Sequence, residues 1–150
     1  MQILRMHHRL PPGVESLAAV AAAEGVRNVR LLIENWESGA QRFDQVGAAL
    51  FAAVDGETTA AIGGVRRETD TDESAMRMHR FYVHPSYRRL GLGSRLAREV
   101  MAHALSHASV LTCNARASEA AAPFWEALGF AIADGISYTH IFRAGMNSAA

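Results

Sequence analysis

Two arginines and two glycines stand together in the segment from Arg88 to Gly93, RRLGLG. The residues before it alternate like a strand, and the residues after it repeat apolar side chains at helical spacing. A helix that begins here leaves its first N–H groups unpaired and carries a partial positive charge. Gly91 and Gly93 remove two Cβ atoms from the approach, and Arg88 and Arg89 add charged donors. These features favour a binding site for the phosphates of a ligand.

Two widespread phosphate motifs do not account for this segment. A P-loop requires GxxxxGK followed by Ser or Thr, and neither a lysine nor a second glycine falls at that spacing. A dinucleotide fingerprint requires GxGxxG, but Leu96 is the sixth residue counted from Gly91. The acidic residue of that fingerprint is also missing, because Glu119 lies too far along and begins a helix. The alternative is a tight strand-to-helix turn that binds nothing and has solvated arginines.

The periodicity of the chain predicts strands and helices in the order βααβββαβαββ, which indicates an α/β or α+β fold with a mixed sheet. Helices are expected from Val14, from Val26 to near Gly39, and from Leu92. Another helix is expected at 118–129, with Ser118 as N-cap and Pro123 marking a kink or a later start. The expected strands are 1–6, 46–54, 58–67, 75–83, 109–115, 130–134 and 136–143, and 146–150 is expected to be a frayed tail.

The composition predicts one domain over residues 1–150. Fifteen basic residues balance fifteen acidic ones, so a nucleic-acid partner is not expected. The sequence has no apolar run of membrane-spanning length, and its N-terminus carries charge where a signal peptide is apolar. The single cysteine, Cys113, fits a reducing compartment, and we expect a cytoplasmic protein.

The segment FYVHPSYRRLGLGSRL, residues 81–96, resembles the acyl-CoA signature of the GNAT-type N-acetyltransferases. It looks like their strand, their V-x-P-x-x-R connector and their (Q/R)xxGx(G/A) loop. The segment VLTCNARASEAAAPFWEALGF resembles their next strand with its terminal Asn and their helix ending in F-Y-x-x-x-G-F. The resemblance covers 76–130, and the first half of the chain matches only in element order.

This resemblance implies a GNAT-like domain whose mixed, mostly antiparallel sheet is splayed at the acyl-CoA site and flanked by helices. It implies acetyl-CoA as co-substrate, with strand backbone facing the pantetheine and thioester, loop N–H groups on the pyrophosphate, and Asn114 on the cofactor arm. The implied cofactor-binding residues are Phe81, Tyr82, Val83, Arg88, Arg89, Gly91, Leu92, Gly93, Ser94, Asn114 and Trp125.

The catalytic acid and base are harder to assign. His79 lies on the strand of the implied thioester site, where some relatives carry a histidine base, and imidazole titrates near working pH. Family members often protonate the leaving thiolate from a tyrosine at the position of Trp125, and indole cannot do this. Tyr82 or Tyr138 is then the donor, or the thiolate leaves unassisted. The alternative for His79 is a packed or solvated strand histidine.

Other reactive residues have simpler interpretations. The seven histidines show no ligand spacing, so no metal is expected. Cys113 is expected to be a core residue. Tyr138 and His140 share one face of the last predicted strand, which the resemblance implies borders the acceptor pocket, so either could touch the substrate, and plain packing is the alternative. The acidic loop 68–74 is expected to be solvated, as are Arg66 and Arg67.

The resemblance leads to two hypotheses that differ in class. The first is an N-acetyltransferase in which a bound amine attacks acetyl-CoA directly in a ternary complex. The second is a catalytically silent acyl-CoA-binding module with a sensing or regulatory role. The expected partner is a small-molecule or peptide amine, without nucleic acid or membrane, and a homodimer would be ordinary for such a fold.

Overall fold

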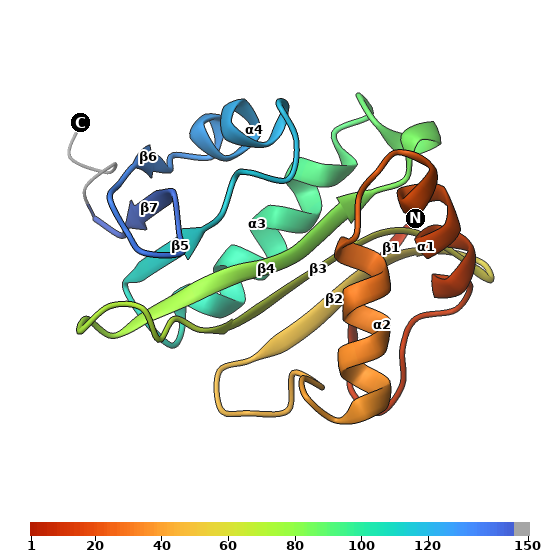
Figure 1. Cartoon of the computed structure of the whole chain (residues 1–150), viewed down its shortest axis with the longest axis horizontal. Coiled ribbons are helices and arrows are strands. Elements are labelled where there is room, and N and C mark those ends of the chain that lie inside the picture. The colour runs from red at the N-terminus through yellow and green to blue at the C-terminus, as the bar shows by residue number, and fades with distance from the viewer. Residues whose placement is uncertain (146–150) are drawn as a thin grey trace.

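The predicted strands form one sheet. In a computed structural model that describes residues 1–145, seven strands lie in the order β1-β2-β3-β4-β5-β7-β6 (Figure 1). They are Gln2–Met6 (β1), Ala49–Asp55 (β2), Thr58–Arg67 (β3), Ala75–Val83 (β4), Val110–Cys113 (β5), Ala131–Ile132 (β6) and His140–Arg143 (β7). Neighbouring strands are antiparallel except β4 and β5, which are parallel. The mixed, mostly antiparallel sheet is confirmed, and the predicted tail at 146–150 lies outside the described residues.

Helices cover both faces of the sheet. They are Val14–Ala23 (α1), Asn28–Ser38 (α2), Leu92–Leu105 (α3) and Ala121–Ala127 (α4), with a short 3-10 turn at Pro85–Tyr87. Figure 1 shows α2 in front of the sheet and α3 behind it. The predicted order of elements along the chain is confirmed.

The first two helices make one hydrophobic core with the front of the sheet. Leu17 of α1 and Val29 and Ile33 of α2 are buried against Leu50 of β2 and Ile62 of β3. These helical residues repeat at a spacing of three to four, which places them along one face of each helix. This core fixes α2 in front of the right-hand part of the sheet in Figure 1, near β2, and leaves the left-hand part of the sheet without a helix in front of it.

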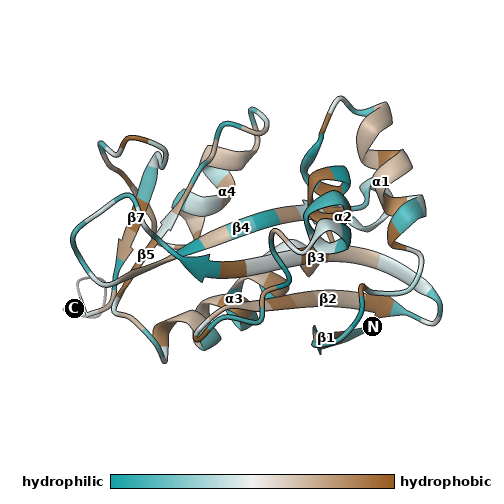
Figure 2. Cartoon of the chain, turned by 60° about the horizontal axis from the view of Figure 1, so that its bottom comes forward, coloured by the Kyte–Doolittle hydropathy of each residue, from teal (hydrophilic) through white to brown (hydrophobic). Residues whose placement is uncertain are grey.

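The second core lies behind the sheet. Leu96 and Val100 of α3 are buried with Val65 of β3, and Trp125 of α4 belongs to the same cluster. Strand β2 contributes Ala53 to this cluster and other residues to the front core, so it is apolar along most of its length (Figure 2). The expectation of a strand buried on both faces is therefore confirmed.

Helix α4 begins later than its periodicity predicts. Its N-cap is Ala120 and no side chain caps it, so the prediction of Ser118 as N-cap is wrong. The later start indicated by Pro123 is confirmed, because proline lacks an N–H and is tolerated in the first turn of a helix.

Strand β7 also begins later, at His140 instead of residue 136. The Ser137 N–H and hydroxyl both donate to the Asp70 carboxylate, at 2.6 and 2.9 Å, and hold this segment as a loop. Tyr138 therefore precedes the strand, and the prediction that it shares a strand face with His140 is wrong.

Candidate active site

The N-terminus of α3 carries unpaired N–H groups. The helix begins at Leu92, its N-cap Gly91 has a φ of 77°, and no side chain caps it. Gly91 is suited to this position because L side chains are strained at positive φ. The Arg95 N–H donates to the Gly91 carbonyl at 3.0 Å, so the N–H groups of Leu92, Gly93 and Ser94 have no acceptor within the helix. Together with the positive end of the helix dipole, they can bind an anion.

The two glycines of the loop act differently. A Cβ added to Gly91 would have nothing within 4 Å, so the approach to the helix end is open there. A Cβ added to Gly93 would lie 3.2 Å from Val83 Cγ2 and 3.3 Å from Phe124 Cε1. Gly93 therefore lets α3 pack tightly against the end of β4 and against α4. The space beside Gly93 is occupied by Val83 and Phe124, so it is not open to a ligand.

The side chain of Arg88 is held by another part of the chain. Its guanidinium donates to both carboxylate oxygens of Glu24, at 2.6 and 2.8 Å, and its Nε donates to the Val83 carbonyl. Hydrogen bonds from Arg88 and from the Tyr82 hydroxyl lower the pKa of Glu24 to about 2. Arg88 thus shapes the loop through Glu24, and its role as a direct phosphate donor stays a prediction.

A surface pocket lies beside the start of α3. It is lined by Met1, Tyr87, Leu90, Gly91, Leu92 and Arg95. Leu90 is 73% exposed, and Arg89 is exposed with a left-handed φ of 65°. An exposed leucine and basic side chains around free N–H groups suit a ligand that carries both phosphate and apolar atoms.

Strand β4 contains a bulge just before its end. Ile62 of β3 pairs with Tyr82, and Gly64 pairs with His79, so β4 has one extra residue between these pairs. That region contains Arg80, whose φ is 60°, a conformation that arginine seldom adopts. Bulges re-aim side chains and interrupt strand pairing, and they often lie next to active sites.

Strands β4 and β5 separate where the resemblance implies a thioester site. They pair only over Ala75–Arg77 of β4 and Val110–Thr112 of β5, whereas β5 pairs with β7 along its whole length. The rest of β4 therefore has β3 as its only strand neighbour among the described strands. The predicted splay is present, and it lies next to the start of α3.

The three residues expected to face the pantetheine have side chains on both faces of the sheet. Phe81 and Val83 pack against the core behind the sheet, and Tyr82 belongs to the front core. The Asn28 side chain donates to the Phe81 carbonyl at 3.2 Å, which occupies one backbone group of this stretch. Burial and the hydrogen bond to Glu24 raise the pKa of Tyr82 to about 12, so its hydroxyl is a weak acid.

Trp125 is part of the core. It is 5% exposed and packs edge-on against Phe81, Phe124 and Phe130, with ring centroids 4.9 to 5.1 Å apart. This packing contributes stabilisation beyond the buried area. Contact of Trp125 with a cofactor stays a prediction, since the indole in this structure is surrounded by aromatic rings of the protein.

His79 lies in front of the sheet at the edge of a narrow pocket. The pocket is lined by Leu32, Asn35, Gln41, Phe43, His79 and Arg80. Burial, as the largest cause, and the positive charges of Arg80, Arg66 and Arg77 together lower the pKa of His79 to about 3. The imidazole is therefore neutral at neutral pH and can accept a proton, although its conjugate acid in this state is strong.

The remaining predicted site residues lie in the second half of the sheet. The Asn114 side chain is exposed, and its Oδ1 accepts the Arg116 N–H at 3.0 Å. Tyr138 is 8% exposed and packs over Gly135, where an added Cβ would meet its ring. His140 is held between Thr139 and Glu126 through its two ring nitrogens, at 2.8 and 2.7 Å. The first two residues keep their predicted roles as predictions.

The residues that were expected to be simply buried or simply solvated differ in outcome. Cys113 is 1% exposed, and burial raises the pKa of its thiol to about 12, so its interpretation as a core residue is confirmed. The acidic loop is not fully solvated, because Glu68 is 3% exposed and accepts hydrogen bonds from Arg77 (2.8 Å) and Thr112 (2.6 Å). Arg66 is half-buried, so its interpretation as a solvated residue is wrong, whereas Arg67 is exposed as expected.

Sequence reasoning missed Glu24, Asn28 and Glu68. Each is a polar residue in a stretch without a motif, and each acts on a residue far along the chain. Only Glu68 is a buried charge, which requires a partner, and the sequence alone gives no signal for any of the three.

The family model described as an acetyltransferase (GNAT) domain matches residues 17–140. The chain therefore belongs to the GNAT acetyltransferase family. Within residues 1–145, no group of three or more metal-ligating side chains occurs, and no helix is both long and apolar enough to cross a membrane.

Solved structures share this fold. The crystal structure of a candidate acetyltransferase from Exiguobacterium sp. 255-15 is 26% identical, with a TM-score of 0.83 over 95% of this chain and 92% of that one. An acetyltransferase from Streptococcus agalactiae 2603 is 15% identical, with a TM-score of 0.70 over 95% and 97%. A GNAT family acetyltransferase from Elizabethkingia anophelis with acetyl-CoA bound is 12% identical, with a TM-score of 0.66 over 95% and 97%. No curated protein sequence matches the chain.

Proposed function

We propose that this chain transfers an acetyl group from acetyl-CoA to an amine. One structural observation carries the proposal: the uncapped N-terminus of α3 lies beside the bulged end of β4, where β4 has separated from β5. An anion site and exposed strand backbone are thus adjacent, as a phosphate-bearing thioester with an extended arm requires. The acetyl-CoA bound to the Elizabethkingia anophelis relative supports this choice of ligand.

The binding roles follow from these positions. The N–H groups of Leu92, Gly93 and Ser94 hold the pyrophosphate, and the exposed Leu90 covers apolar atoms of the ligand. The backbone of β4 beyond Arg77 holds the pantetheine in an extended form, as an added strand would be held. When bound, acetyl-CoA supplies the electrophilic thioester carbon.

The chemistry requires a proton acceptor near the amine. The amine nitrogen forms a bond to the acetyl carbon, the carbon–sulfur bond breaks, and the thiolate leaves with the electron pair. A ring nitrogen of the neutral His79 accepts the proton that the amine loses. An N–H group at the splayed end of β4 stabilises the developing oxyanion.

The leaving thiolate takes its proton from water. The Tyr82 hydroxyl already donates to Glu24, and its pKa of about 12 makes transfer to a thiolate, with a pKa of about 8.5, uphill. The Trp125 indole is buried among aromatic rings. Because a free thiolate is stable near neutral pH compared with an alkoxide, departure without a donor is chemically reasonable.

A second function is an acyl-CoA-binding module without catalysis. The low pKa of His79 and the burial of Trp125 favour it, because both weaken the chemistry and leave the binding site intact. In either case the acceptor or regulatory partner, the oligomeric state and the cytoplasmic location stay predictions.

Two measurements separate these functions. Calorimetric titration with acetyl-CoA and CoA should show one binding site per chain. Thiol release from acetyl-CoA should then depend on both the protein and an added amine. Binding without amine-dependent thiol release would favour the silent module, and no binding would exclude both functions.

A further inference from the structure

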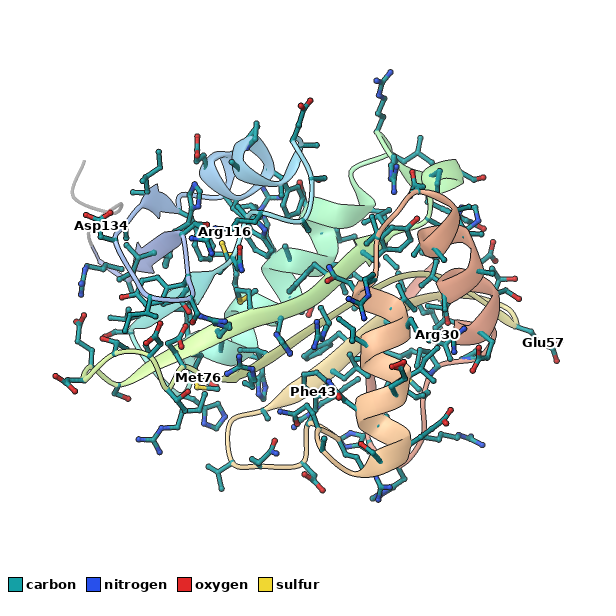
Figure 3. The ribbon with its side chains drawn as sticks, viewed as in Figure 1. Arg30, Phe43, Glu57, Met76, Arg116 and Asp134 are labelled. Carbon is teal, nitrogen blue, oxygen red and sulfur yellow. The ribbon has the colours of Figure 1, made fainter. Side chains whose placement is uncertain are left out.

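The front face of the sheet beyond α2 carries a group of arginines around His79. Arg66 of β3 lies two residues from Gly64, whose missing Cβ faces the Phe43 ring, so strand alternation places Arg66 in front of the sheet. Figure 3 shows Phe43 beside α2 and Arg116 across β4 from it, on the loop after β5. We call Arg66, Arg77 and Arg80 the front arginines.

The front arginines repel one another. Arg66 and Arg77 are directly opposite in the pairing of β3 and β4, an arrangement that destabilises a sheet when both residues carry the same charge. Burial lowers the pKa of both Arg66 and Arg80, and the charge of a neighbouring front arginine lowers it further in each case. The folded chain therefore keeps three cations close together at a cost in stability.

The protein compensates one of these three charges. Arg77 donates to the buried Glu68 at 2.8 Å and to Ser137 at 2.5 Å. Within residues 1–145, neither Arg66 nor Arg80 forms an ion pair, and the buried Nε of Arg80 has no hydrogen-bond partner. The guanidinium of Arg66 donates to the Arg67 carbonyl at 3.1 Å. A buried donor without a partner is costly, and Arg80 is one of the residues that line the pocket beside His79.

We infer that the acceptor is a small amine that also carries a carboxylate, which Arg66 and Arg80 bind beside His79. This inference rests on the proposed function and specifies its substrate class. A guanidinium presents a planar set of N–H donors that matches a carboxylate in two-pronged geometry. The narrow pocket beside His79 is lined by Arg80 and by the neutral amides of Asn35 and Gln41, whereas Arg66 lies outside it on β3, so the carboxylate binds at the mouth of the pocket.

The bound carboxylate of the substrate also makes His79 a stronger base. The charged groups that act on His79 are Arg66 from β3 and Arg77 and Arg80 from β4, and Glu68, which follows β3, pairs with Arg77, whereas α2 contributes neutral Leu32 and Asn35. A carboxylate bound by two of these arginines reduces the positive field at the imidazole. Because positive neighbours hold its pKa low, His79 becomes a better proton acceptor when the right substrate is bound.

The test compares amino acids with their carboxamides as acceptors. Each pair matches in size and differs in the negative charge, and because the amine of the carboxamide is less basic, rates are compared at equal concentrations of unprotonated amine. Rates of thiol release from acetyl-CoA should give a kcat/KM at least tenfold higher for the acid of the best pair. Acetyl-CoA binding is measured separately by calorimetry, so a failure of the proposed function is recognised by the absence of binding.

Matched variants assign the effect to the arginines. Arg66→Gln and Arg80→Gln should each lower kcat/KM for the acid at least tenfold and leave the amide nearly unchanged. Arg67→Gln removes the same charge from an exposed neighbour on β3 and should stay within twofold of the wild type. Arg66→Gln should also raise the melting temperature of the unliganded protein, since it relieves repulsion, which a merely structural role would not do.

Several results would overturn the inference. They are acetyl-CoA binding with no acid acetylated, amides or polyamines reacting as well as acids, or an acid preference that survives in both Arg66→Gln and Arg80→Gln. If Arg80→Gln fails to fold because of the unusual backbone at that position, Arg66→Gln alone decides the question.

Discussion

Arg88 and Glu24 form a two-pronged ion pair, with nitrogen–oxygen distances of 2.6 and 2.8 Å, between residues 64 positions apart. The pair joins the end of α1 to the loop that precedes α3, and the Tyr82 hydroxyl donates to the same carboxylate. The loop that shapes the proposed pyrophosphate site is therefore positioned by Glu24, which lies outside the segment 81–96 that predicts the site. Arg88 therefore fixes the position of the loop in addition to contributing a positive charge.

The variant Glu24→Gln should lower the free energy of unfolding by about 1 kcal/mol at pH 7, because the pair is partly exposed. Glutamine keeps an acceptor for Tyr82 and removes the charge that binds Arg88. The folded pKa of Glu24, about 2, lies below its usual 4.5, so its stabilisation is complete above pH 4.5 and is lost as the pH falls toward 2. Urea unfolding at several pH values measures the difference.

The control for this variant is Glu15→Gln, which breaks an exposed ion pair with Arg30 elsewhere on the surface. It should change stability less and should not affect acetyl-CoA binding. If Glu24→Gln and Glu15→Gln changed the free energy of unfolding and the affinity for acetyl-CoA equally, a positioning role for Glu24 would be contradicted.

The variant Ser94→Glu should weaken acetyl-CoA binding at least tenfold, because it places a negative charge in the first turn of α3, where the pyrophosphate is proposed to bind. The same charge interacts favourably with the helix dipole, so the melting temperature should stay equal or rise. Ser94→Gln has the same shape without the charge and should bind nearly as well as the wild type. Calorimetry and thermal unfolding measure the two properties, and a loss shared by both variants would not support an anion site.

The variant His79→Gln should flatten the dependence of stability on pH. The folded pKa of His79 is about 3 and its usual value is 6.5, so between these values the unfolded state binds a proton that the folded state does not. His79 therefore makes the folded protein less stable as the pH falls from 6.5 toward 3. Urea unfolding at pH 7, 6 and 5 should show a steeper loss for the wild type, and parallel losses would contradict a strongly lowered pKa.

The variant His79→Gln also tests whether His79 is the catalytic base. His79→Gln should reduce kcat about a hundredfold, since glutamine cannot accept the proton. For the wild type, the limb of kcat/KM that belongs to His79 should lie at acidic pH, as expected from its lowered pKa in the free enzyme. A limb near neutral pH that survives in His79→Gln belongs to the amine itself, and unchanged kcat would exclude His79 as the base.

The order of elements could be predicted because each local pattern agrees with the fold. The bounds of β3 and β4, Thr58–Arg67 and Ala75–Val83, match the alternating segments read from the sequence. The start of α3 could be predicted because Gly91 is one of few residues that suit its left-handed N-cap.

The features that escaped prediction depend on distant contacts. Nothing around Arg80 indicates a bulge, because arginine has no preference for a left-handed backbone. Ser137 interrupts a strand-like stretch because Asp70 binds it, 67 positions away. Glu68 lies in an acidic run of solvated appearance, and burial becomes favourable through its contacts with Arg77 and Thr112.

The most direct test of the central claim is a calorimetric titration of the purified chain with acetyl-CoA, in parallel with Ser94→Glu and Ser94→Gln. We expect one molecule bound per chain, binding reduced at least tenfold by the added carboxylate, and near-normal binding by the glutamine variant. Absence of acetyl-CoA binding to the wild type, or equal binding by all three proteins, would contradict the claim that the N-terminus of α3 holds the pyrophosphate.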